Sequence, residues 1–134
     1  MNPEIDEDGN EYWYVNGKLH REDGPAVTMT DGNKYWFLNG KRHCEDGPAI
    51  VYANGTKYWY INAALHREDG PAIKESNGNA YWYRDDKLHR EDGPAMEFIN
   101  GTKHWFLLGK EQTMNHEDPR WHILVAKMRR QNES

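Results

Sequence analysis

Aromatic residues recur in this chain at a fixed interval of 23 positions, which is neither a helical period nor a simple alternation. Fourteen of the 17 aromatic residues fall in three adjacent columns of this repeat. The columns are Tyr12, Tyr35, Tyr58 and Tyr81; then Trp13, Trp36, Trp59, Trp82 and Trp105; then Tyr14, Phe37, Tyr60, Tyr83 and Phe106. A fixed period of this length is typical of an array of short stacked units.

Each unit has the pattern of a β-hairpin. In the stretch "AIVYANGTKYWYI" at 49–61, two runs rich in β-forming residues flank the dipeptide Asn54-Gly55. Asn-Gly and Asp-Gly tolerate positive φ at both positions, so they favour two-residue hairpin turns. The equivalent dipeptides in the other units are Asp8-Gly9, Asp31-Gly32, Asn77-Gly78 and Asn100-Gly101.

A two-residue turn fixes which side chains share a face of the sheet. It places Ile50 opposite Trp59, and Val51 opposite Tyr58. We therefore expect Ile50, Trp59 and their equivalents to form the core face, with aliphatic side chains filling the space between stacked tryptophans. Tyr58 and Tyr60 are expected on the opposite face, where their hydroxyl groups can meet water.

The C-terminal stretch breaks the repeat and has the pattern of a helix over 117–131. Asp118 suits the N-cap, Pro119 suits the first helical position, and basic residues gather at the far end. One apolar face is formed by Trp121, Leu124, Val125 and Met128. We expect this helix to cap the last unit, because an open sheet edge invites aggregation. An exposed helix that binds a partner is the alternative.

These patterns predict an all-β fold in a single domain, residues 1–134. It consists of stacked β-hairpins that form a single-layer, twisted antiparallel sheet. About four and a half units span residues 8–110, and the C-terminal α-helix caps them.

The stretch "KYWFLNGKRHCEDGPAIVYANGTKYW" at 34–59 resembles the MORN repeat, a 23-residue hairpin unit. The period agrees, as do "NGK" at 39–41 and "YANGTKY" at 52–58. The resemblance covers residues 8–110. The glycine that the family places between tyrosine and tryptophan is absent, since Trp59 follows Tyr58 directly, and "EDGP" replaces a shorter link. The chain therefore resembles a variant of the bacterial and phage kind.

The resemblance implies interaction rather than catalysis, because MORN proteins are mainly scaffolds that bind proteins, dimerise or attach domains to membranes. It supplies no catalytic residue and no cofactor. It implies a non-enzymatic protein-interaction module, of which a phage accessory protein that binds and inhibits or sequesters a host protein is one form.

A charged segment, "HREDGPA", occurs at 20–26, 66–72 and 89–95, and "HCEDGPA" occurs at 43–49. Asp-Gly-Pro is turn chemistry, in which Asp caps local N–H groups and Pro begins the next strand. We therefore interpret these segments as joints between units. The joint residues are His20, Arg21, Asp23, His43, Asp46, His66, Arg67, Asp69, His89, Arg90 and Asp92.

Two chemical readings of the joints compete with the structural one. His66 with Glu68 or Asp69 is a candidate acid–base pair of a hydrolase. The same groups are candidate metal ligands, although each joint supplies only one His and two carboxylates. Because identical groups recur at every unit instead of converging, we expect neither a catalytic residue nor a metal site.

The tyrosines are the candidate binding residues, because rigid amphipathic side chains are enriched at protein interfaces. These candidates are Tyr12, Tyr35, Tyr58, Tyr60, Tyr81 and Tyr83. The alternatives are that the C-terminal helix or a second copy in a homodimer covers this face. A small nucleotide-like ligand stacked between the tyrosines is a further alternative.

Composition narrows the class of partner. The formal net charge is −5, which argues against a nucleic-acid binder that works by charge alone. The mean hydropathy is −1.10, and no apolar run approaches the roughly 20 residues that a membrane span needs. The single cysteine, Cys44, excludes an internal disulfide framework and suits a reducing cytoplasm, or the host cytoplasm if the protein is phage-encoded.

Overall fold

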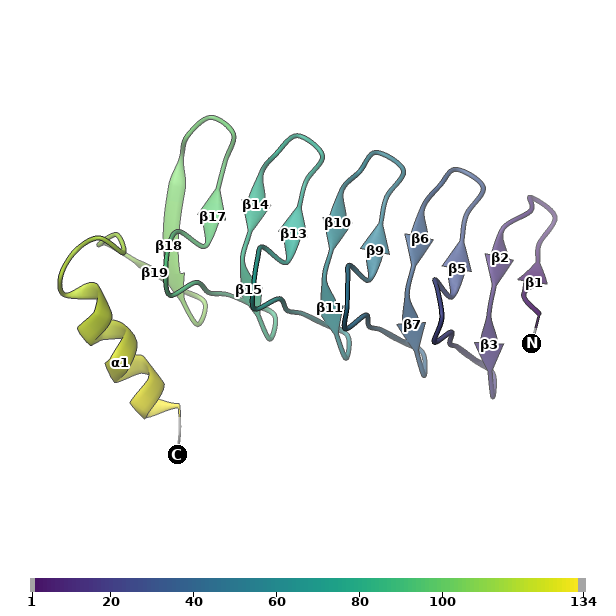
Figure 1. Ribbon diagram of the computed structural model, residues 1–134, viewed down its shortest axis with the longest axis horizontal. Helices are drawn as coiled ribbons and strands as arrows, with labels where there is room; N and C mark the ends of the chain where they lie inside the picture. The colour runs from purple at the N-terminus through teal and green to yellow at the C-terminus, as the bar shows by residue number, and fades with distance from the viewer. Residues whose placement is uncertain (1, 133–134) are drawn as a thin grey trace.

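The computed structural model describes residues 2–132 as a row of stacked hairpins with one helix at its end (Figure 1). This confirms the predicted all-β fold of stacked hairpins. The main sheet has eleven antiparallel strands. In spatial order they are β1 (Glu4–Ile5), β2 (Glu11–Tyr12), β5 (Val27–Thr28), β6 (Lys34–Tyr35), β9 (Ile50–Val51), β10 (Lys57–Tyr58), β13 (Ile73–Lys74), β14 (Ala80–Tyr81), β17 (Met96–Glu97), β18 (Lys103–Leu107) and β19 (Lys110–Gln112).

Each complete unit contains a second, smaller hairpin that the sequence analysis did not predict. The chain leaves the main sheet beyond the tryptophan and forms a two-stranded hairpin at the lower edge in Figure 1. These hairpins are β3 (Tyr14–Val15) with β4 (Lys18–Leu19), β7 (Phe37–Leu38) with β8 (Lys41–Arg42), β11 (Tyr60–Ile61) with β12 (Ala64–Leu65), and β15 (Tyr83–Arg84) with β16 (Lys87–Leu88).

The two-residue turns lie in these lower hairpins, not at Asn54-Gly55. Both turn residues have positive φ, as the type I′ geometry requires: 51° at Asn39 and 79° at Gly40. In the third unit the turn is Asn62-Ala63, and Ala63 is held at φ 70° without being glycine. The "NGK" at 39–41 is therefore the tight turn.

The upper hairpins have three-residue loops, so the predicted register is wrong by one residue. The N–H of Tyr52 donates to the carbonyl of Thr56 at 2.9 Å, which leaves three residues in the loop. Gly55 takes φ +95° at the loop's third position. The observed pairs are Tyr58 with Ile50 and Lys57 with Val51. A slip of one residue moves every side chain to the other face.

As a result, the tyrosines share a face with the aliphatic residues, and the tryptophans lie on the opposite side. One row of directly paired residues crosses the main sheet. It contains Tyr12, Val27, Tyr35, Ile50, Tyr58, Ile73, Tyr81 and Met96. We call this the aromatic face. The neighbouring row on the opposite face is largely charged, and includes Lys34, Lys57, Lys74, Glu97 and Lys103.

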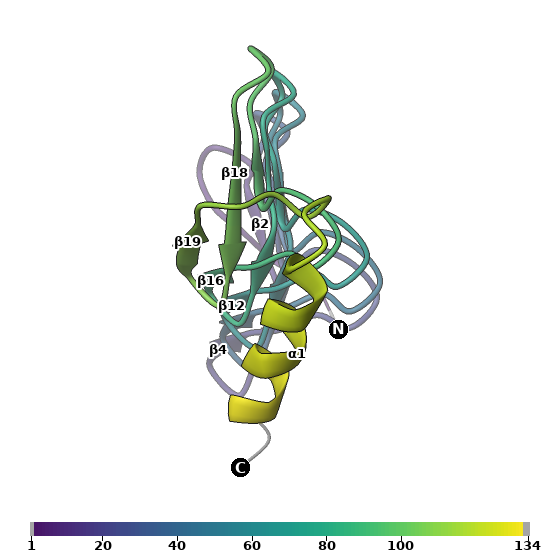
Figure 2. The same ribbon diagram turned by 90° about the vertical axis from the view of Figure 1, so that its left-hand side faces the viewer.

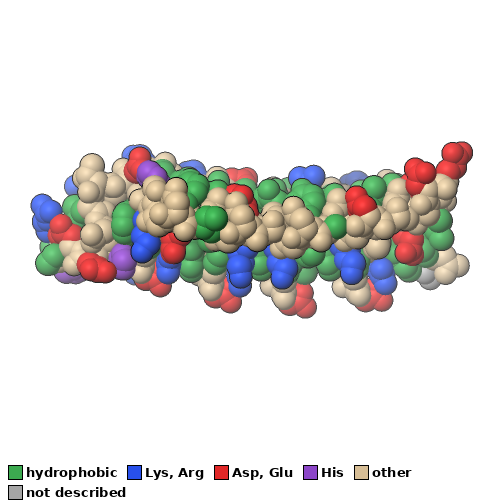
Figure 3. Space-filling view, turned by 90° about the horizontal axis from the view of Figure 1, so that it is seen from above, with side chains coloured by type: hydrophobic (Ala, Val, Ile, Leu, Met, Phe, Trp, Pro, Cys, Tyr) green, Lys and Arg blue, Asp and Glu red, His purple; other side chains and the backbone are tan. Residues whose placement is uncertain are grey.

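The joints all bulge to the same side of the sheet in the end-on view (Figure 2). This is the tryptophan side, because arginines of three joints lie over the tryptophan rings. From above, basic side chains form a row along one long side and acidic side chains project beyond them (Figure 3). Each joint ends in an alanine that is fully buried; these are Ala26, Ala49, Ala72 and Ala95. The carbonyl of Ala49 accepts a hydrogen bond from the N–H of Trp36 at 2.7 Å.

The helix α1 (Trp121–Gln131) closes the C-terminal end of the array. It begins four residues later than predicted, since residues 117–120 form turns. The prediction of Asp118 as N-cap is wrong, because Arg120 holds that position; Asp118 accepts a hydrogen bond from the backbone N–H of Arg120 at 2.9 Å in the turn before the helix. Trp121 and Val125 are buried against Leu107. Among residues 2–132, the structure has no helix with the length and apolar character that crossing a bilayer requires.

Candidate functional site

Most of the joints contain an arginine that stacks on a tryptophan. In three of the four joints an arginine guanidinium lies over the tryptophan of its unit, with Cζ to ring-centroid distances of 4.2 Å for Arg21, 4.0 Å for Arg67 and 3.9 Å for Arg90. Arg67 also donates to Asp69 at 3.2 Å and to the carbonyl of Pro71 at 3.1 Å. Each of these arginines therefore pairs with the aspartate of its own joint, and Arg90 also donates to Glu97 at 2.8 Å.

The joint histidines connect neighbouring units through their Nδ1 atoms. Each Nδ1 accepts a hydrogen bond from a backbone N–H in the lower turn of the next unit. The pairs are His20 with Asn39 at 2.9 Å, His43 with Asn62 at 2.9 Å, His66 with Asp85 at 3.1 Å, and His89 with Leu108 at 2.9 Å. An accepting Nδ1 carries no proton, so the bonded ring is the neutral form protonated at Nε2.

The other ring nitrogen of each histidine faces the glutamate of the same joint. The Nε2 to carboxylate distances are 3.5 Å to Glu22, 3.4 Å to Glu45, 3.6 Å to Glu68 and 3.1 Å to Glu91. Both nitrogens of each ring are thus engaged in structural contacts. The joint therefore has the geometry of a latch between units, without a ring nitrogen directed at a separate reacting group.

The second joint has Cys44 in place of arginine. Its thiol donates to Asp46 at 3.3 Å. Burial raises the pKa of the Cys44 thiol, and the hydrogen bond to Asp46 raises it further. A raised pKa keeps the thiol protonated at neutral pH, which makes it a poor nucleophile. Among the described residues, no three His, Cys, Asp or Glu side chains are grouped so that they could hold a metal ion.

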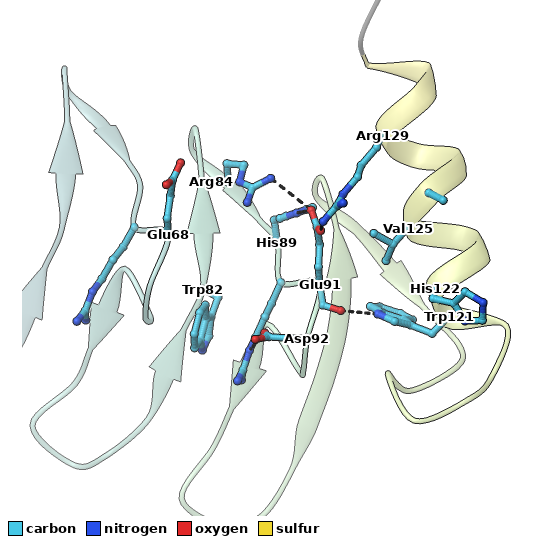
Figure 4. Close-up of a pocket in the computed structure, with 13 residues that line it drawn as sticks. Glu68, Trp82, Arg84, His89, Glu91, Asp92, Trp121, His122, Val125 and Arg129 are labelled. Atoms are coloured by element: carbon cyan, nitrogen blue, oxygen red, sulfur yellow. Dashed lines mark hydrogen bonds and ion pairs between the residues drawn. The ribbon is translucent and has the colours of Figure 1, made fainter.

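The fourth joint differs because α1 packs against it (Figure 4). The indole Nε1–H of Trp121 donates to the backbone carbonyl of Glu91 at 2.6 Å. The carboxylate of Glu91 pairs with Arg129 of the helix, with Arg84 at 3.4 Å and with His89 at 3.1 Å. Burial alone would raise the pKa of Glu91, but Arg129 and His89 lower it below its ordinary value.

The aromatic face is the second candidate site, and it carries the tyrosines named from the sequence. Tyr58 and Tyr60 lie on the same face, with ring centroids 6.5 Å apart. Tyr52 meets Tyr35 and Tyr58 edge-to-face at 6.2 and 5.6 Å, and so belongs to this face as well. Tyr12, Tyr35, Tyr58, Tyr60, Tyr81 and Tyr83 are all partly exposed.

Burial keeps Tyr58, Tyr81 and Tyr83 neutral. Burial and Glu75 raise the pKa of Tyr81 to about 12, and burial also raises the pKa of Tyr58 and of Tyr83. Neutral phenols both donate and accept hydrogen bonds. The α1 helix does not cover this face, because its apolar partners are Trp105, Leu107 and Met114 on the other side.

One column of functional side chains was missed from the sequence. Residues just after each upper turn accept a backbone N–H of the next unit: Asn10 from Thr30 at 2.8 Å, Asn33 from Ala53 at 2.7 Å, Thr56 from Ser76 at 3.0 Å, and Asn79 from Ile99 at 2.9 Å. The signal was present, since a short polar residue follows the turn glycine in every unit. These bonds and the histidine bonds fix neighbouring units at both ends.

No family model matches the chain, and no curated protein matches its sequence. The resemblance to the MORN repeat therefore stays a prediction that rests on the period and on the quoted motifs.

Proposed function

We propose that this protein is a non-enzymatic protein-interaction module that binds another protein through the aromatic face. The observation that carries the proposal is the single row of alternating tyrosine and aliphatic residues across the main sheet. Tyrosine offers a large contact area and a polar hydroxyl with few rotatable bonds, so little entropy is lost when it is ordered at an interface.

The surroundings of the row support the same function. Neither α1 nor a second sheet layer packs over this face in the described part of the chain, and the two ribbon views agree on this (Figures 1 and 2). The opposite side of the same strands is charged, with Lys57 and Lys74 directly paired. An amphipathic sheet with one open aromatic face is suited to burying that face against a partner.

The test compares two matched double variants on opposite faces of the same strands. Tyr58→Ala/Tyr81→Ala alters the aromatic face, and Lys57→Ala/Lys74→Ala alters the charged face. Each immobilised variant is incubated with a bacterial lysate, because the repeat resembles bacterial and phage proteins, and retained proteins are identified by mass spectrometry. We expect the tyrosine variant to lose a partner that the lysine variant keeps, while both keep the β-sheet circular dichroism of the wild type.

Three results would count against the proposal. A retained set that is the same for the wild type and the tyrosine variant would show that the face is not the binding surface. A dimer in sedimentation that only the tyrosine variant abolishes would show that the face joins two copies of this chain. A thermal shift with nucleotides that the tyrosine variant loses would favour a small ligand instead.

A further inference from the structure

The joints form a row of clefts on the tryptophan side of the sheet, opposite the aromatic face. The first lies between the first and second joints and has a volume of about 650 Å³, with Trp36 and Leu38 in its lining. The second lies between the second and third joints, has about 610 Å³, and includes Trp59 and Ile61. The third, of about 520 Å³, is lined by Trp82 and by α1 itself.

The helix α1 shows what the end of this row accepts. Trp121 and Val125 pack on Leu107 and Trp105, which stand at the repeat positions of the tryptophan–aliphatic pairs in the first two clefts. At the same time Trp121 donates to the Glu91 carbonyl, and Arg129 pairs with the Glu91 carboxylate (Figure 4). An aromatic side chain on an apolar floor and a cation on the joint glutamate together hold the helix.

The first three joints repeat the acidic part of this arrangement with no described residue of α1 against them. The side chain of Glu91 is 17% exposed, whereas those of Glu22, Glu45 and Glu68 are 83%, 83% and 77% exposed. The first two clefts also have the apolar floor, whereas Arg84 takes the aliphatic position in the third. The structure thus contains one occupied docking site for a basic helix and two open sites that repeat its joint glutamate and its tryptophan–aliphatic floor, with Arg67 lying over Trp59 in the second.

The spacing of the clefts matches a helix that lies along the row. The sheet advances by two strands per unit, or about 9–10 Å. Seven residues of an α-helix rise about 10.5 Å, so side chains at i and i+7 would meet successive clefts. The sequence of α1 has this spacing in Trp121 and Met128, with Arg129 next to the second; at the end of the array both side chains pack on the one cluster around Leu107, because no further cleft follows.

We propose that the first and second clefts bind a basic amphipathic helix of a protein partner, with large apolar residues at i and i+7 and arginine beside the second. The apolar side chains enter the two clefts, and the arginines pair with Glu22, Glu45 and Glu68. This site is independent of the aromatic face, since it lies on the other side of the sheet.

The test uses a fluorescent peptide with the sequence of residues 119–131 as the probe and the full chain as the receptor. We expect saturable binding by fluorescence anisotropy. Glu45→Gln/Glu68→Gln should weaken it by about tenfold or more, because charge-assisted hydrogen bonds are lost. The matched control is Glu4→Gln/Glu7→Gln, which changes the net charge equally at exposed positions away from the joints and should leave the affinity unchanged. A peptide with alanine at the position of Trp121 should not bind.

Four outcomes would overturn the inference. The first is the absence of saturable binding. The second is equal binding to both double variants. The third is binding that only Glu91→Gln weakens, since the peptide would then be displacing the chain's own α1. Tyr58→Ala/Tyr81→Ala should leave peptide binding intact. Loss of binding in that variant would show that the peptide binds the aromatic face, which would refute the cleft site but not the proposed function of the aromatic face.

Discussion

At three of the four joints a glycine allows the arginine guanidinium to lie flat between backbone and indole. A Cβ on Gly70 would lie 2.6 Å from the Cζ of Arg67, and one on Gly93 would lie 2.6 Å from that of Arg90. The same glycine is less confined in the second joint, where a Cβ on Gly47 would lie 4.0 Å from the sulfur of Cys44. The joint glycine therefore has no space for a Cβ where arginine precedes it by three residues, and has that space where Cys44 replaces the arginine.

We expect Gly70→Ala to destabilise the protein by about 1–2 kcal/mol, since Arg67 must give up its stacking and its hydrogen bonds. The matched change Gly47→Ala should stay within about 0.5 kcal/mol of the wild type. Urea denaturation measures both. Equal losses in the two variants would mean that contact with arginine is not what selects glycine here.

The buried histidine of the fourth joint gives the protein a pH dependence. Burial lowers the pKa of His89 below its ordinary value of 6.5, and Arg84 and Arg129 add to this effect, whereas Glu91 acts in the opposite direction without cancelling it. The unfolded chain therefore binds a proton at a higher pH than the folded chain does, so stability falls as the pH drops below about 6.5. Protonation would also compete with the hydrogen bond from Leu108 to Nδ1.

We expect His89→Asn to flatten the decline in the free energy of unfolding between about pH 7 and pH 5. The asparagine oxygen can still accept the N–H of Leu108, but it does not titrate. His122→Asn on the exposed side of α1 is the control and should keep the wild-type slope. Urea denaturation at a series of pH values gives the slopes, and an unchanged slope for His89→Asn would contradict the assignment.

At the scale of the element, the two hairpin types of each unit determine which face every residue joins. Asn-Gly stands in both: at 39–40 both residues have positive φ, whereas at 54–55 only the glycine does. The dipeptide alone does not distinguish a two-residue turn from a three-residue loop that also ends in glycine. This is why the sequence predicted the hairpins and their stacking but gave the wrong register.

The type I′ turns offer a direct test of backbone strain. Ala63 at φ 70° occupies a position where three other units have glycine, Gly17 at φ 78°, Gly40 at φ 79° and Gly109 at φ 82°. We expect Ala63→Gly to stabilise the protein by about 0.5–1 kcal/mol, because glycine reaches this region without steric cost. Gly40→Ala should destabilise it by a similar amount. Thermal unfolding measures both changes. A loss of stability in Ala63→Gly would contradict the inference that the backbone of Ala63 is strained.

The helix was predictable because its apolar face repeats at i, i+3, i+4 and i+7. Its contact with Glu91 was not predictable, since Glu91 is 30 residues away from Trp121 in the chain and matches three other glutamates in sequence. The exposed joint glutamates and the buried one differ only in what packs on them. The candidate tyrosines were found because their column is regular, but their neighbours on the face depended on the register.

We expect Trp121→Ala to cost about 3 kcal/mol in the stability of the C-terminal end, since a buried indole and its hydrogen bond are both lost. Ile123→Ala is the control, because Ile123 is 59% exposed. Hydrogen exchange should show faster exchange in α1, β18 and β19 of the tryptophan variant, with little change in β5 and β6. Uniformly faster exchange would contradict a cap that acts locally.

At the scale of the whole molecule, each unit forms its strand ladders and its histidine latch with its neighbours in the array. Stability in such arrays is approximately a sum of unit and nearest-neighbour contributions. Because successive units have the same joint and the same strand pairing, one unit can replace another without changing any pairing type. The fold therefore allows arrays with different numbers of units.

Deletion of residues 49–71 tests this interchangeability. It joins Pro48 to Ala72, so that Ile73 pairs with Tyr35 in place of Ile50. We expect a folded, shorter array with a lower free energy of unfolding and a smaller urea m-value, because less surface is exposed on unfolding. A deletion of residues 49–60 breaks the period and should abolish the cooperative transition. An unfolded product from the first deletion would show that the units are not equivalent.

The strands lie across the long axis of the array, so their hydrogen bonds run along it (Figure 1). Tension applied between the two ends would therefore load one strand pair at a time, as in opening a zipper, and would not shear many bonds together. A unit of 23 residues that spans about 9–10 Å when folded could extend to about 80 Å when released. Pulled from its ends, the protein would lengthen in uniform steps under low force, which is the behaviour of a compliant tether.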